Sequence, residues 1–356
     1  MAKPAYDQKT LIYDLNLDDL EKAFAAWGEP SYRARQVWQG LYRQFWDKAE
    51  EFSMLPAKLR ARLGETFLFT PLCPIRTLES SDRQTVKTLF ELVDGQAIET
   101  VLMRYDDRRT LCISTQVGCG MGCVFCATGQ MGFRRHLSSG EIVAQVIHYA
   151  RLLHQQEEKV SNVVIMGMGE PFHNYESTLA AIDRLNHPDG MNLGERRFTI
   201  STVGLIPTIR RFTNEKRQIN LAISLHASED ELRSSMLPVN KKYPIKDLIE
   251  ACREYVAVTG RRITFEWALI QGVNDSVGEA RKLAKLLKGL LCHVNVIPLN
   301  PTRMFDGKST TRERAQAFKD ALQTAGIPCT IRIRRGIDIQ AGCGQLASRF
   351  EKENSA

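Results

Sequence analysis

The sequence predicts an α/β protein whose core is a partial, open (βα)6 barrel resembling part of a TIM barrel, with a small N-terminal helical module and a β-hairpin extension. Three observations predict this fold. From residue 109 onward, short apolar segments alternate with amphipathic helical runs, which indicates parallel strands with helices packed outside them. Six such repeats occur, too few to close an eight-stranded barrel. Hydrophobic residues occupy 43% of the 356 positions, so a large core is available.

Residues 1–70 are predicted to form the helical module. Apolar residues recur at helical spacing over 17–28, 30–44 and 55–67. The second of these helices interleaves basic and aromatic side chains: Tyr32, Arg33, Arg35, Trp38, Tyr42 and Arg43. That mixture suits RNA binding, but the aromatic residues equally suit an ordinary core.

Residues 71–108 change to the two-residue period of strands. Two alternating segments, TVKTLFEL and AIETVLMRY, flank Asp94 and Gly95, a pair typical of tight hairpin turns. We therefore expect a β-hairpin that leads into the barrel.

The barrel core is expected over residues 109–346, followed by a disordered tail at 347–356. Its strands are predicted at 110–115, 160–167, 197–202, 219–225, 262–269 and 292–299, with 328–333 as a candidate edge strand. Its helices are predicted at 138–154, 175–186, 205–214, 244–258, 276–289 and 311–325. The first of them begins with a capping box, Ser138 to Glu141.

The charge and hydropathy patterns indicate where the protein acts. The formal net charge is +7, and adjacent basic residues occur in seven pairs, which suits a polyanionic partner or simply a solvated surface. No run of about 18 apolar residues occurs, and the N-terminus lacks the apolar segment of a secretion signal. We therefore expect a cytoplasmic protein without a membrane segment, and we expect a monomer.

Polar and flexible residues follow the predicted strands where each strand ends. Because the carboxyl ends of parallel barrel strands form the active-site rim, we expect these residues to share one site, although such residues are common in any loop. They are Gly169, Glu170, Ser201, Ser224, Leu225, His226 and Asn300.

Three cysteines follow the first barrel strand in VGCGMGCVFC, with C-x3-C-x2-C spacing: Cys119, Cys123 and Cys126. A structural zinc site usually has four ligands, and no fourth ligand lies nearby. A cubane 4Fe–4S cluster held by three cysteines keeps one iron open for a substrate or cofactor. Isolated cysteines are usually small buried residues of the hydrophobic core. We assign this core role to Cys73, Cys252, Cys292 and Cys329.

The cysteine spacing, with Phe125 before the third cysteine, resembles the radical S-adenosylmethionine (radical SAM) superfamily, whose fold is a partial TIM barrel. Further motifs narrow the resemblance to the RlmN/Cfr family of RNA adenosine methyltransferases, over nearly the whole chain. They are VGCGMGCVFCATGQMGF (117–133), VIMGMGEP (164–171), SLHA (224–227), VNVIPLNP (294–301) and GIDIQAGCGQL (336–346).

The resemblance implies a role for each candidate. The three clustered cysteines would hold one 4Fe–4S cluster whose open iron binds SAM, and the strand-end residues would contact SAM. Two SAM molecules are used per turnover. The first methylates Cys343, and a radical made from the second activates that methyl group to join adenine. Glu99 acts as general base, and Cys112 releases the product through a transient disulfide with Cys343. From the residues alone, Glu99 could equally be an ordinary strand carboxylate facing solvent.

Within the family, the sequence is most similar to RlmN, because Pro171 follows Glu170 where Cfr-type proteins tend to carry alanine. This implies methylation of adenine C2 in the peptidyl-transferase region of 23S rRNA and next to the anticodon of some tRNAs, with an external one-electron reductant. The alternatives are a Cfr-type C8 methyltransferase conferring ribosomal antibiotic resistance and a zinc-stabilised RNA-binding protein without catalysis.

Overall fold

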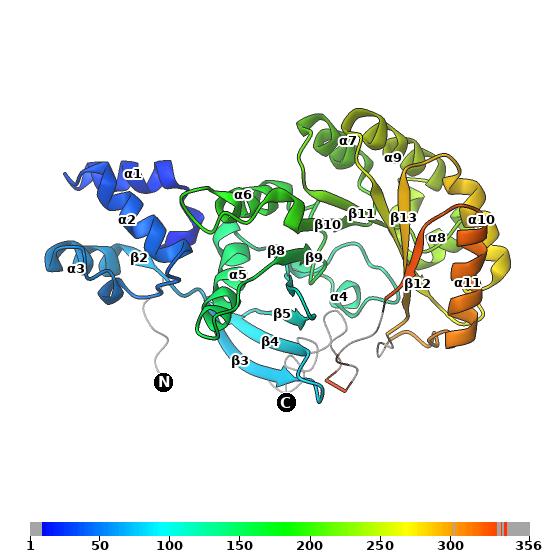
Figure 1. Ribbon diagram of the computed structural model, residues 1–356, viewed down its shortest axis with the longest axis horizontal. Helices are drawn as coiled ribbons and strands as arrows, with labels where there is room; N and C mark the ends of the chain where they lie inside the picture. The colour runs from blue at the N-terminus through cyan, green and yellow to red at the C-terminus, as the bar shows by residue number, and fades with distance from the viewer. Residues whose placement is uncertain (1–8, 301, 303, 333–335, 337, 340–356) are drawn as a thin grey trace.

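A computed structural model describes residues 9–300, 302, 304–332, 336, 338 and 339. Its centre is a curved sheet of ten strands in the order β14-β13-β12-β11-β10-β9-β6-β5-β4-β3 (Figure 1). Within this sheet, the seven strands from β6 along to β14 are parallel, as predicted. They are β6 (Arg109–Cys112), β9 (Asn162–Ile165), β10 (Phe198–Thr202), β11 (Asn220–Ser224), β12 (Ile263–Leu269), β13 (Cys292–Pro298) and the predicted edge strand β14 (Cys329–Ile331).

The antiparallel part of the sheet is larger than the predicted hairpin. Strands β4 (Thr85–Leu92) and β5 (Ala97–Arg104) form that hairpin, and β3 (Leu72–Glu79) adds a third strand. Strand β5 pairs with β6, so the three strands continue the barrel sheet.

Helices cover the outside of the sheet (Figure 1). The predicted ones are α5 (Ser139–His154), α6 (Tyr175–Asn186), α7 (Ile206–Glu215), α9 (Ile245–Thr259), α10 (Val277–Leu287) and α11 (Arg312–Thr324). The capping box at Ser138 is present, because its side chain accepts from the Glu141 amide while Glu141 accepts from the Ser138 amide. Two short helices were not predicted: α4 (Ala127–Gln130) in the cysteine loop and α8 (Asp230–Met236) after β11.

The N-terminal module lies at one end of the molecule (Figure 1) and contains α1 (Leu17–Ala26), α2 (Ser31–Tyr42) and α3 (Ala57–Thr66). In α2, Trp38 and Tyr42 are almost fully buried, whereas Tyr32 is 52% exposed. Most of the aromatic pattern of α2 is therefore core. The module is attached to the barrel by polar contacts as well, such as the bond from the Ser139 hydroxyl to Asp14 (3.0 Å).

The two faces of the sheet differ in polarity. Trp267 of β12 packs on Phe318 of α11, and the Tyr149 hydroxyl of α5 bonds to Thr88 of β4, so these positions face the helices. Because side chains alternate along a strand, neighbouring positions face the inside of the barrel. This inner face is polar and includes Lys87, Glu99, Cys112, Ser201, Ser224, Glu266 and Asn295.

The isolated cysteines were predicted correctly with one exception. Cys252, Cys292 and Cys329 are buried in the core, but Cys73 is exposed on the outermost strand β3. Strand β3 is the last strand of the sheet, so it has a hydrogen-bonded neighbour on one side only. Fewer neighbouring elements therefore cover its side chains. In the described residues, no helix is long and apolar enough to cross a membrane.

Candidate active site

The cysteine loop follows the first barrel strand, as predicted, and folds back on itself. Strands β7 (Gln116–Gly118) and β8 (Phe133–His136) form a small antiparallel sheet around it. Gly118 has φ +69°, and a Cβ there would lie 1.9 Å from the Gly132 carbonyl oxygen, so a glycine is required. The Val124 amide donates to the carbonyl of Met236 (3.0 Å), which fixes the loop to the end of α8.

The three thiols lie in apolar surroundings near one another. Cys119 and Cys123 are each 8% exposed, and Cys123 packs against Met236 and Leu237. Burial, with smaller contributions from charge repulsion by Glu170 and Cys126, raises the pKa of Cys119 to about 12. Burial also raises the pKa of Cys123 well above its usual value, so removing the thiol protons of Cys119 and Cys123 is unfavourable unless a cation compensates the negative charge.

Three soft sulfur donors on one loop fit an iron–sulfur cluster, and the apolar shell would shield it from water. Across the described ranges, no three His, Cys, Asp or Glu side chains already converge as the ligands of a metal ion. The metal-binding role of Cys119, Cys123 and Cys126 therefore rests on donor chemistry and proximity, and stays a prediction.

The loop after β9 carries Gly169 and Glu170 against the cysteine loop. Gly169 has φ +107°, and a Cβ there would lie 2.6 Å from the Gln116 Cβ. The carboxylate of Glu170 is 2% exposed and accepts from the amides of Phe172 and Val203 (both 2.9 Å). Burial raises the pKa of Glu170 to about 7. The carboxylate thus joins the ends of β9 and β10.

The ends of β10 and β11 bring four further candidates together. The hydroxyls of Ser201 and Ser224 are 3.4 Å apart, and Leu225, the residue after Ser224, is fully buried. His226 has φ +60°, a strained conformation for a non-glycine residue. Its Nδ1 accepts from the Ala268 amide (2.9 Å), so the neutral ring carries its proton on Nε2. Burial lowers the pKa of His226 to about 3.

His226 also connects these strand ends to the cysteine loop, since its ring lies edge-on to Phe125 with centroids 4.9 Å apart. Asn300 is exposed after β13, and no described contact joins it to the other candidates.

Two buried side chains that the sequence did not single out position these loops. Arg233 of α8 is fully buried and donates to the carbonyls of Val203 (2.7 Å), Ser224 (3.1 Å) and Leu225 (3.1 Å). Gln116 is also fully buried, and its Oε1 accepts from the Glu170 amide (2.8 Å). Arginine and glutamine are usually exposed, so their sequence context gave no indication of these roles.

Glu99 and Cys112 lie together on the inner face. Glu99 is 4% exposed, so the alternative that it faces solvent is wrong. Its carboxylate pairs with the fully buried Lys87 (Nζ to Oε1, 3.5 Å). Cys112 is partly buried, faces Val101 across the β5–β6 pair, and its pKa is raised to about 11 by burial. Cys343 lies outside the described residues.

An open parallel barrel with a three-cysteine loop at its carboxyl rim defines a radical SAM enzyme, and residues 113–286 match the family model described as "Radical SAM superfamily". Membership of that superfamily implies SAM and a 4Fe–4S cluster. Residues 10–68, which cover α1 to α3, match the model "Ribosomal RNA large subunit methyltransferase N-terminal domain".

Relatives that match the chain over nearly its whole length show which family within the superfamily it belongs to. The chain is 49% identical over 353 residues to "Probable dual-specificity RNA methyltransferase RlmN" of Chloroflexus aurantiacus, covering 96% of this chain and 94% of that protein. It is 47% identical over 348 residues to "Dual-specificity RNA methyltransferase RlmN 1" of Myxococcus xanthus, covering 98% and 97%. A crystal structure of a radical SAM methyltransferase from Sphaerobacter thermophilus superposes with a TM-score of 0.92 at 52% identity, covering 94% and 98%. The chain belongs to the RlmN family of radical SAM methyltransferases.

Proposed function

We propose that this enzyme methylates C2 of an adenosine in the peptidyl-transferase region of 23S rRNA and of the adenosine 3′ to the anticodon in some tRNAs. The match to RlmN relatives over almost the whole chain, N-terminal module included, carries the proposal. We also propose two SAM molecules per turnover, an external one-electron reductant, and Cys343 as the residue that carries the methyl group.

Cofactor binding is assigned to the rim of the barrel. Cys119, Cys123 and Cys126 would hold the cluster, and Gly169, Glu170, Ser201, Ser224, Leu225, His226 and Asn300 would contact SAM. When bound, these cofactors supply one-electron chemistry that ordinary side chains lack. The protein's part is to hold the reactants: the Gly169 backbone allows close approach, and the Glu170 carboxylate suits an ammonium group.

Proton and sulfur chemistry is assigned to the inner face. Once the methyl carbon of Cys343 is bonded to the base, Glu99 would take the ring proton from C2, and a one-electron acceptor would take the unpaired electron left by the radical addition, which restores the aromatic ring. Cys112 would then lose its proton and attack the sulfur of Cys343, so that an S–S bond forms as the S–C bond breaks. The electron pair stays with the departing carbon, which takes up a proton in place of the one that Cys112 lost and becomes the methyl group of the product. A thiol reductant would restore both cysteines. The raised pKa of Cys112 keeps it protonated and unreactive at neutral pH until a base removes its proton.

Nucleoside analysis tests this function. Ribosomal RNA and tRNA from cells with and without the gene would be digested and analysed by mass spectrometry. We expect 2-methyladenosine in both RNAs only when the protein is present. Finding 8-methyladenosine alone would show the Cfr-type activity instead, and finding no methylated adenosine would refute the function.

Metal content tests the cofactor. Anaerobically purified protein should be brown and contain about four iron atoms per chain. A colourless protein that contains zinc under the same conditions would support the non-catalytic zinc alternative.

A further inference from the structure

Three exposed aromatic rings lie beside the candidate active site. Phe133 is 42% exposed, and His136 and His173 are exposed as well. The ring centroids are 5.0 Å apart for Phe133 and His136, 5.5 Å for Phe133 and His173, and 4.9 Å for the two histidines. Packed aromatic rings that stay exposed on a folded protein are a common feature of binding surfaces.

The rings adjoin both loops assigned to cofactor binding. Phe133 follows the cysteine loop, and its Cβ is 3.4 Å from the position that a Cβ on Gly120 would take. His173 lies three residues after Glu170, and its amide donates to the Glu170 carbonyl (3.0 Å). A ligand on these rings would therefore border the rim where SAM is proposed to bind.

Gln116 orients both histidines. The amide of Glu170 can only donate, so the Oε1 of Gln116 must accept it and the Nε2 must be a donor. That Nε2 lies 3.1 Å from Nδ1 of His136 and 3.2 Å from Nδ1 of His173, so both rings accept at Nδ1. Burial and the neighbouring His173 lower the pKa of His136, which favours its neutral ring.

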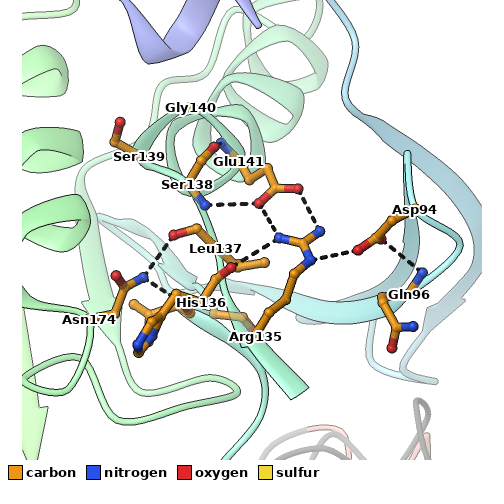
Figure 2. A network of polar contacts seen from close by, with 12 residues as sticks. Asp94, Gln96, Arg135, His136, Leu137, Ser138, Ser139, Gly140, Glu141 and Asn174 are labelled. Carbon is orange, nitrogen blue, oxygen red and sulfur yellow. Dashed lines mark hydrogen bonds and ion pairs between the residues drawn. The ribbon is translucent and has the colours of Figure 1, made fainter. Parts of the chain in front are cut away.

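The segments that carry the rings are held rigidly. Figure 2 shows Arg135 bonded to Asp94 of the β4–β5 turn (2.6 Å), to Glu141 of α5 (2.8 and 2.9 Å) and to the carbonyl of His136 (3.0 Å). Asn174, next to His173, donates to the carbonyl of Leu137 (2.8 Å). The rings are therefore arranged before any ligand arrives, which lowers the entropic cost of binding.

We propose that Phe133, His136 and His173 form an aromatic platform on which an unpaired base of the RNA substrate stacks, beside the target adenosine. This inference rests on the proposed function. Sequence-specific RNA recognition usually takes unstacked bases onto aromatic side chains, and an enzyme that modifies a base must remove it from its stack. The exposed Arg134 on the same strand adds positive charge beside the rings.

Equilibrium binding of two fluorescein-labelled RNAs tests the platform. One is a hairpin with an unpaired adenosine-containing loop, and the other is a fully paired duplex of equal length. The full chain, purified anaerobically with its cluster, would be compared with Phe133→Leu, Phe133→Tyr and the double variant His136→Ala/His173→Ala. Leu152→Ala is the matched control, because Leu152 is also 42% exposed but lies near the far end of α5.

We expect Phe133→Leu and the double histidine variant to raise the Kd for the hairpin roughly tenfold or more, with little change for the duplex. Phe133→Tyr should bind nearly as the original protein does, because its ring still stacks. The slope of log Kd against log salt should not change, since no phosphate contact is removed. Each variant's thermal unfolding would be recorded to confirm that it is folded.

Equal hairpin affinity in the original protein, Phe133→Leu and the double variant would overturn the platform. So would an equal loss for the duplex, or an equal loss in Leu152→Ala. Nucleoside analysis separates these outcomes from failure of the proposed function: an active enzyme whose variants bind normally disproves the platform alone. A protein that binds neither RNA and gives no 2-methyladenosine disproves both.

Discussion

Glu170 should make the stability of this enzyme depend on pH near neutrality. Its pKa is raised from 4.5 to about 7 because the carboxyl is buried. Between these two values the folded protein binds a proton that the unfolded chain releases, so the folded state gains stability as pH falls through 7. Replacing Glu170 by glutamine removes this titration and keeps the shape of the side chain.

The size of the effect follows from the two pKa values. Between pH 8 and pH 5.5, the linkage relation gives a gain of about 2 kcal/mol in the free energy of unfolding from this one group. In the original protein the backbone amides of Phe172 and Val203 each donate to one oxygen of the Glu170 carboxylate. Glutamine replaces one of these oxygens by an NH₂ group, so one amide loses its acceptor. That mismatch costs a further ~1–3 kcal/mol, but the cost does not depend on pH and so cancels between pH values.

Urea unfolding of the original protein and of Glu170→Gln, each at pH 5.5 and pH 8, measures the contribution of Glu170 to the pH dependence of the unfolding free energy. The difference in unfolding free energy between the two proteins should shift by about 2 kcal/mol in favour of the original protein at the lower pH. Glu79→Gln is the control, because Glu79 is exposed on β3 and should show no such shift. A difference that is the same at both pH values would refute the link between burial and titration.

Three further predictions concern other parts of the site. Gly169→Ala should weaken SAM binding in calorimetry of the cluster-loaded protein, because alanine at φ +107° costs about 1–3 kcal/mol, while Gly194→Ala, with open space around it, should not. Arg233→Met should lower the free energy of unfolding by ~3 kcal/mol or more, since several buried carbonyls lose their donor; a loss below about 1 kcal/mol would contradict the positioning role. Cys112→Ala should accumulate a covalent RNA–protein adduct on denaturing gels, whereas Cys252→Ala, in the core, should not; an active Cys112→Ala preparation without adduct would argue against a resolving thiol.

The barrel was predictable because its strands and helices repeat with clear periods. The elements that sequence reasoning missed are short or irregular. Strand β3 has mostly exposed residues and a register shift beside Pro74, so it lacks the alternation of a half-buried strand. Strand β7 has three residues and helix α8 has seven, and neither gives a periodic pattern long enough to recognise.

The site was predictable where position alone determines it. Residues at the carboxyl ends of parallel strands meet at one rim, so Ser201 and Ser224 could be placed together without knowing any contact. The positions of Gln116 and Arg233 in the site could not be predicted, because their roles depend on hydrogen-bond partners that are distant in sequence. Arg233, for example, bonds to the carbonyl of Val203, 30 residues away.

The position of Glu99 shows a more general limit. Alternation identifies which residues of a strand share a face, but it does not say whether that face meets water or the inside of a barrel. On an ordinary antiparallel sheet the charged face is solvated, which is why Glu99 could be taken for a surface carboxylate. In this fold the charged face turns inward, where Glu99 and Lys87 are both buried.

That inward polarity also connects fold to function. The inner face continues from Ser224 to Glu266 and Asn295 on paired strands, and the Asn295 amide donates to Glu266 (2.8 Å). Glu266 is 5% exposed, and burial raises its pKa, so keeping it there costs stability. Closed TIM barrels fill their interior with apolar layers instead. Here the apolar core lies between sheet and helices, which leaves the inside of the open barrel with the polar groups that a nucleotide and a sulfonium cofactor require.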